Sequence, residues 1–155
     1  MLEHKLLYWS RSGPIDFDGD LDSVWRPRRY TEGSDLTLVA FGAMVHEATA
    51  AAGRCPRSVE VWNPFVLSPL NLGPIAASVE KTGRLLVVQE CGATQGLGDR
   101  VISLAVRQCG RAMRHPPKLI AAPDVPVPFA PELESFCRPD TDKILAGIEQ
   151  MFGGR

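Results

Sequence analysis

The hydrophobic pattern is clearest between residues 84 and 113. Residues 84–89 hold the uninterrupted apolar run LLVV, which is typical of a strand buried on both faces of a sheet. A polar, glycine-rich segment follows, and after Gly98 the apolar residues recur at helical spacing. These residues are Ile102, Ala105, Val106, Cys109 and Met113. The pattern predicts a central strand that turns directly into a helix, and ligands of open α/β sheets usually bind at such strand ends.

Strands and helices are predicted to alternate along the chain from residue 35 onward. The predicted strands are residues 36–41, 58–62, 84–89 and 118–121, and the predicted helices are residues 44–53, 71–83, 98–113 and 139–152. Residues 123–131 contain too many prolines for a regular strand ladder, so this segment is predicted to run extended over the surface. This alternation predicts the α/β class, with a largely parallel sheet covered by helices on both faces.

The first 33 residues lack a periodic apolar pattern. We predict that residues 1–33 form an extended linker and that residues 34–155 form the domain. The linker's alternating acids also suggest a calcium-binding loop; they are Asp16, Asp18, Asp20 and Asp22. That motif requires Gly directly after its third acid and Glu at its twelfth position, where this chain has Leu21 and Pro27. The linker is therefore the preferred interpretation.

The composition argues against nucleic acid and membranes as partners. A chain of 155 residues, 45% of them hydrophobic, suits one soluble domain, and a net charge of −1 gives no electrostatic field that would attract nucleic acid or a membrane surface. The N-terminal segment MLEHKLLYWSRSG is too short and too charged for a signal peptide or a membrane span, so a cytoplasmic location is expected. The four cysteines form no CxxC pair, which argues against zinc and redox motifs.

Several nucleotide-binding and catalytic motifs can be rejected. Gly96 and Gly98 resemble the start of a dinucleotide-binding loop, but its third glycine would fall at Val101. There is also no Walker loop and no GxSxG motif. The histidines at positions 46 and 115 are more simply interpreted as surface residues.

The turn after the central strand holds the remaining candidates. Glu90 is the one acid at the end of that strand, and we expect it to accept hydrogen bonds from N–H groups of the turn. At least one of Gly96 and Gly98 is expected to have a positive φ. If Glu90 instead pointed into an open cleft and both glycines had negative φ, a ligand site would become the better hypothesis.

Several segments together resemble one protein family. They are LEHKLLY at 2–8, EGSDLTLVAFGAMVHEA at 32–48, KTGRLLVVQE at 81–90, GLG at 96–98 and APDVPVPFAPELE at 122–134. They resemble the C-terminal part of beta subunits of thiamine diphosphate-dependent 2-oxoacid dehydrogenases, which include the pyruvate, acetoin and branched-chain enzymes. The resemblance implies the transketolase C-terminal domain fold, a three-layer α/β/α domain with a mostly parallel five-stranded sheet and one antiparallel strand. Where the family usually has an Asp-Leu-Arg-Thr run, this chain has residues 63–66, NPFV.

The resemblance also implies a role in assembly. In the family, this domain contacts a second beta subunit and docks the acyltransferase subunit, while thiamine diphosphate and magnesium are held by the pyrimidine-binding domain and the alpha subunit. No catalytic, cofactor-binding or metal-binding residue is therefore assigned to this chain, and its first 33 residues would follow the end of a pyrimidine-binding domain. The chain by itself is not expected to be active.

Six residues are candidates for an interface or a functional loop. They are Glu90, Gly96, Gly98, Asp124, Val127 and Phe129. Val127 and Phe129 lie among prolines, so their apolar side chains need either the domain's own core or a partner, and a homodimer is expected. The alternative is a free-standing α/β domain that binds a small anionic ligand near residues 90–98.

Overall fold

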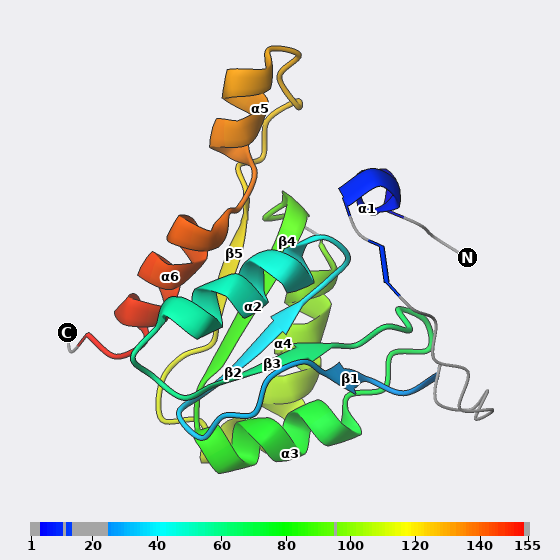
Figure 1. Ribbon diagram of the computed structural model, residues 1–155. Helices are drawn as coiled ribbons and strands as arrows, with labels where there is room; N and C mark the ends of the chain where they lie inside the picture. Colours follow the sequence, from blue (N-terminus) through cyan, green and yellow to red (C-terminus); the bar gives the residue numbers. More distant parts are fainter. Residues whose placement is uncertain (1–3, 11, 14–24, 95, 154–155) are drawn as a thin grey trace.

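A computed structural model describes residues 4–10, 12–13, 25–94 and 96–153. Its centre is a five-stranded sheet with the order β1-β3-β2-β4-β5 (Figure 1). The strands are β1 (Arg28–Arg29), β2 (Leu36–Ala40), β3 (Val59–Asn63), β4 (Leu85–Gly92) and β5 (Lys118–Ala122). β1 pairs with β3 in the antiparallel direction, and the remaining pairs are parallel. The predicted α/β class and five-stranded sheet are confirmed.

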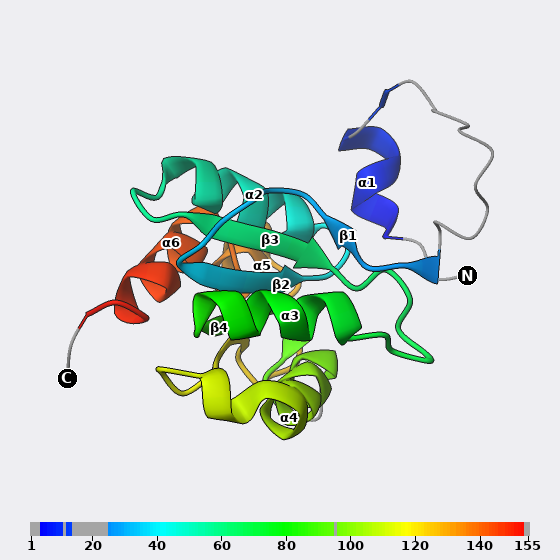
Figure 2. The same ribbon diagram turned by 90° about the horizontal axis from the view of Figure 1, so that it is seen from below.

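Helices cover both faces of the sheet, as predicted. α2 (Met44–Arg54) and α6 (Thr141–Gln150) pack on one face, and α3 (Gly73–Thr82) and α4 (Leu97–Cys109) pack on the other (Figure 2). A single 3₁₀ turn, Gly110–Ala112, extends α4. Two short helices, α1 (Lys5–Ser10) and α5 (Pro131–Cys137), lie outside these layers. No helix in the described ranges has the length and apolar character needed to cross a membrane.

The alternation of side chains along each strand separates the core into two parts. On β2, Leu36 and Leu38 belong to the cluster beneath α2 and α6, whereas Val39 belongs to the cluster above α3 and α4. All three are 0% exposed. Both faces of β2 are buried, and its one polar side chain, Thr37, is also 0% exposed, with its hydroxyl hydrogen-bonded to those of Ser78 and Thr82.

The structure departs from the predicted elements in three places. β1 lies inside the predicted linker; it has only two residues, both exposed, so no apolar alternation marks it. β4 continues to Gly92, beyond the predicted end at residue 89. α5 was not predicted, although Pro131 in its first turn and Glu132 close behind are usual signs of a helix start. Because Pro131 ends a proline-rich segment that was predicted to be extended, the helix that begins there was not predicted.

The residues from Pro123 to Arg138, here called the arm, project away from the sheet and carry α5 (Figure 1). The arm confirms that residues 123–131 form no strand. The aspartates of the rejected calcium-binding loop, residues 16, 18, 20 and 22, lie outside the described part of the chain. Within that part, no group of His, Cys, Asp or Glu side chains could hold a metal ion.

Candidate functional site

A cavity of about 780 Å³ opens at the carboxyl edge of the sheet, where the chain diverges after β2 and β4. β2 and β4 are neighbours, but β2 leads into α2 on one face while β4 leads into α4 on the other. The two connections separate, which leaves a crevice between them. Phe41 and Gly42 follow β2 into the cavity, and Gln89 and Glu90 reach it from β4. The cavity thus lies where the sequence placed its candidate site.

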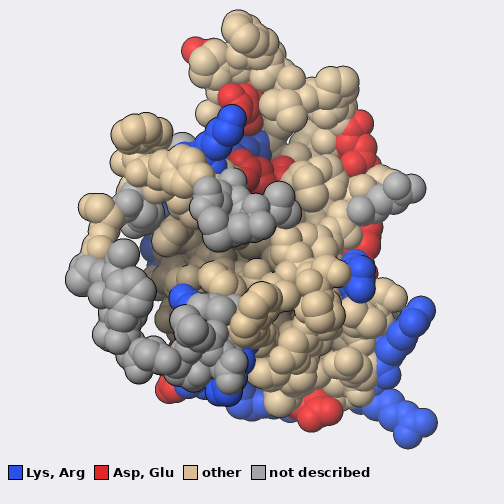
Figure 3. All heavy atoms as spheres, turned by 90° about the vertical axis from the view of Figure 1, so that its right-hand side faces the viewer, with Lys and Arg blue, Asp and Glu red and all other residues tan. Residues whose placement is uncertain are grey.

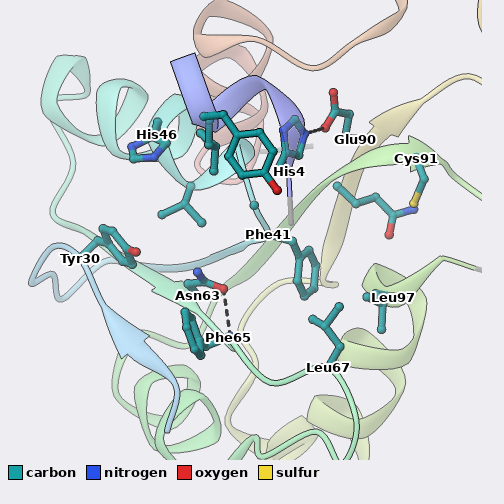
Figure 4. A pocket seen from close by; sticks show the side chains of 15 residues that line it. His4, Tyr30, Phe41, His46, Asn63, Phe65, Leu67, Glu90, Cys91 and Leu97 are labelled. Carbon is teal, nitrogen blue, oxygen red and sulfur yellow. Dashed lines mark hydrogen bonds and ion pairs between the residues drawn. The ribbon is translucent and has the colours of Figure 1, made fainter. Parts of the chain in front are cut away.

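The wall of the cavity is mostly apolar and aromatic (Figure 4). Its aromatic residues are Tyr8, Tyr30, Phe41 and Phe65. No lysine or arginine is among the described residues that line it. Arg28 lies close by but stacks on the Phe65 ring, with its guanidinium carbon 4.5 Å from the ring centre. A small anion would therefore meet the Glu90 carboxylate and no lysine or arginine of the described lining, which argues against the anionic ligand considered from the sequence.

His4 and Glu90 form a polar pair at one end of the cavity. Nε2 of His4 lies 2.5 Å from Oε2 of Glu90, and their side chains are 28% and 37% exposed. Gly42, with φ +53°, lets the imidazole lie against the backbone, because a Cβ there would come within 3.2 Å of the His4 ring. The other ring nitrogen of His4, Nδ1, is buried without a hydrogen-bond partner in the described structure. His4 is not among the candidate residues predicted from the sequence, and it is 86 positions from Glu90 in the chain.

The hydrogen bonds predicted for Glu90 are made by Gln89 instead. Nε2 of Gln89 donates to the Gly92 carbonyl at 2.5 Å, and Oε1 accepts from the Gly98 N–H at 2.7 Å. Successive side chains of a strand point to opposite faces, so Gln89 points toward α4 and Glu90 toward the side of α2. The prediction for Glu90 was wrong by one residue. Assigning each side chain of the central strand to a face would have identified Gln89.

The prediction of a positive φ at Gly96 or Gly98 was also wrong. Gly96 has φ −81°, and the described glycines with positive φ are Gly42 and Gly83. At Gly96 and Gly98, close packing rather than backbone conformation excludes larger side chains. A Cβ on Gly98 would lie 2.5 Å from Cδ1 of Leu119 and 2.7 Å from Oε1 of Gln89. A Cβ on Gly96 would collide with the same Gln89 amide.

Asp124 connects the turn after β4 to the base of the arm. One carboxylate oxygen accepts from the Thr94 N–H at 3.0 Å, and the other accepts from the Thr94 hydroxyl. These hydrogen bonds, the hydroxyl one first, lower the pKa of Asp124. Farther along the arm, Val127 is 77% exposed and Phe129 is 102% exposed. Neither side chain is buried in the domain's own core.

Of the remaining histidines and cysteines, His46 and Cys91 line the same cavity as the His4–Glu90 pair. His46, expected at the surface, is half-buried and lines the cavity from α2. His115 lies in the turn before β5, with Nδ1 2.8 Å from the Pro116 carbonyl oxygen. The four cysteines are free thiols, as expected, and burial raises the pKa of Cys109.

Residues 27–144 match the family described as "Transketolase, C-terminal domain". The chain belongs to this family. The match confirms the resemblance seen in the sequence, and it begins at Pro27, directly before β1.

Curated relatives are beta subunits of oxidoreductases. The chain is 34% identical over 147 residues to the "Pyruvate dehydrogenase E1 component subunit beta" of Bacillus subtilis, covering 93% of this chain and 45% of that protein. It is 32% identical over 157 residues to the "Acetoin:2,6-dichlorophenolindophenol oxidoreductase subunit beta" of Cupriavidus necator, covering 99% of this chain and 46% of the relative. The chain therefore spans less than half the length of these relatives.

A solved structure described as "Split gene transketolase, inactive beta4 tetramer" has the same fold. It superimposes with a TM-score of 0.67 over 81% of this chain and 42% of the other, at 21% sequence identity. At that identity the likeness establishes the fold alone.

Proposed function

We propose that this domain is the C-terminal assembly and docking domain of a pyruvate dehydrogenase-like beta subunit, and that its arm forms the contact with a second copy. The arm carries the observation on which this proposal depends. Its five large apolar side chains are all exposed; they are Val125, Val127, Phe129, Leu133 and Phe136. In Figure 3 the arm is at the top of the molecule, and its surface is mainly uncharged.

Apolar side chains on a projecting segment gain free energy when a partner removes them from water. The prolines of the arm prevent it from adding a regular strand to another sheet, so the contact is made through side chains. Asp124 holds the base of the arm against Thr94, which limits how far the arm can fold back. The solved neighbour is described as a tetramer, which supports self-association as the mode of contact.

The partners, compartment and cofactors of the complete enzyme are part of the same proposal, which the beta-subunit relatives support. The partners would be an alpha subunit and an acyltransferase subunit, and the compartment would be the cytoplasm. Thiamine diphosphate and magnesium would be held by parts of the complete enzyme outside this domain. Residues 1–33 would connect it to a pyrimidine-binding domain, with β1 joining the end of that linker to the sheet.

Sedimentation velocity tests the role of the arm. The unaltered chain is expected to sediment as a dimer at high micromolar concentration, and Phe129→Asp is expected to give a monomer because it places a charge in the apolar contact. The unfolding midpoint should not change, since Phe129 is fully exposed. Val106→Asp is the control, because Val106 is 46% exposed on α4, away from the arm. A monomer in the unaltered chain, or a dimer in the Phe129 variant, would contradict the proposal.

A further inference from the structure

The cavity at the carboxyl edge presents the carboxylate of Glu90 to its interior. In the described structure Glu90 makes one polar side-chain contact, through Oε2 to His4, and its carboxylate is partly accessible. Since a carboxylate only accepts, Nε2 of His4 carries the hydrogen of this pair. Glu90 lines the cavity and its side chain is 37% exposed, so a ligand in the cavity that donates hydrogen bonds would reach this carboxylate.

The charge of the lining residues also favours a ligand that donates hydrogen bonds. Glu90 is the one acidic residue among the described lining residues, and no lysine or arginine accompanies it there. A positively charged group would therefore be attracted to this end of the cavity and a negatively charged group would be repelled. Figure 4 shows His4 and Glu90 together at one end, with Phe41, Tyr30 and Phe65 around the remaining space.

The aromatic walls suit the body of such a ligand. A volume of about 780 Å³ lies within the range of small-molecule sites, and aromatic faces attract both flat apolar groups and cations. Phe65 is held in an uncommon left-handed conformation, with φ +63°, by the hydrogen bond from its N–H to Oδ1 of Asn63 at 2.9 Å. Strained backbone of this kind is found at binding sites, where it fixes a side chain in place.

We propose that the cavity is a binding site for a small amine with an aromatic body, in which Glu90 accepts hydrogen bonds from the protonated amine and the aromatic wall holds the ring. This site is separate from the arm and goes beyond the assembly function. It also differs from the sequence-based alternative, because its ligand is a cation rather than an anion.

Calorimetric titration with two probes of the same ring and opposite charge tests the proposal. Tryptamine carries an ammonium group and indole-3-acetate a carboxylate. The unaltered chain is expected to bind tryptamine saturably and at least about tenfold more tightly than indole-3-acetate, as a hydrogen-bonded charge pair implies. Failure to bind tryptamine, or equal binding of both probes, would overturn the proposal.

Two variants locate the site. Glu90→Gln keeps the shape of the side chain and should remove most of the preference for tryptamine, while Glu132→Gln, on the exposed face of α5, should leave it unchanged. Leu67→Lys is the second variant, because Leu67 lies half-buried in the cavity wall on a loop that tolerates substitution. It should weaken tryptamine binding and strengthen indole-3-acetate binding. An unchanged preference in a folded Glu90 or Leu67 variant would show that the probe binds elsewhere.

Discussion

At the scale of the residue, Gly98 shows how packing rather than backbone angle can require glycine. Gly98→Ala is expected to lower the free energy of unfolding by about 1–3 kcal/mol, because the new methyl group overlaps Leu119 and Gln89. Urea denaturation measures the change. Gly53→Ala is the matched control: it also lies within a helix, but a Cβ there meets nothing within 4 Å, so helix propensity should make it neutral or slightly stabilising. Equal effects of the two substitutions would disprove the packing explanation.

At the scale of the element, α6 depends on polar contacts at its first turn. The Asp140 side chain accepts from the Lys143 N–H at 2.8 Å, and Glu47 of α2 accepts from the N–H and the hydroxyl of Thr141. Asp140→Ala should cost about 1 kcal/mol in thermal or urea unfolding, because the cap is lost. Asp140→Asn should cost much less, since an amide oxygen can accept the same bond. If both variants lost the same stability, the cap would not be the cause.

At the scale of the whole molecule, Glu60 connects β1, β3 and α3 and makes stability depend on pH. It is 1% exposed, and its carboxylate contacts Arg29 Nη1 at 3.3 Å, Lys81 Nζ at 3.0 Å and the Ser78 hydroxyl. Burial raises the pKa of Glu60. The hydrogen bonds from Ser78 and Lys81 and the charge of Lys81 together lower the pKa by more than burial raises it, so the net shift is downward. The pKa of Asp140 is lowered as well: burial raises it, and the Lys143 contacts outweigh that effect.

A carboxyl group whose pKa is lower in the folded state stabilises the protein above its unfolded pKa and loses that contribution as pH falls through the folded value. The free energy of unfolding should therefore stay constant as the pH is lowered to about 5, and it should decrease at pH values under about 4. Glu60→Gln should lower it by about 1–3 kcal/mol at pH 7 and reduce its acid dependence. Glu80→Gln, exposed on α3, is the control. An acid dependence in Glu60→Gln equal to that of the unaltered chain would contradict this assignment.

Much of the fold could be predicted from local sequence. The apolar run of β4 is buried on both faces, so its burial is visible without knowing its neighbours. The helices α2, α3, α4 and α6 each have one apolar face, which appears at a fixed spacing in the sequence. β1 could not be predicted in this way, because two exposed residues become a strand only when β3 lies beside them. The prolines of the arm likewise excluded a strand but did not reveal α5.

The sequence by itself determined the fold class and predicted the candidate site at the end of the central strand, because both follow from short-range patterns of apolar residues and glycine. The prolines left open whether Val127 and Phe129 pack in the core, and the tertiary structure shows both exposed. Only the tertiary structure decided which polar groups meet at the candidate site. His4 reaches Glu90 across 86 positions, and the alternation of β4 gives the hydrogen bonds of the turn to Gln89 while Glu90 turns toward the cavity. Such contacts depend on how separate elements pack, and no local pattern in the chain specifies that packing.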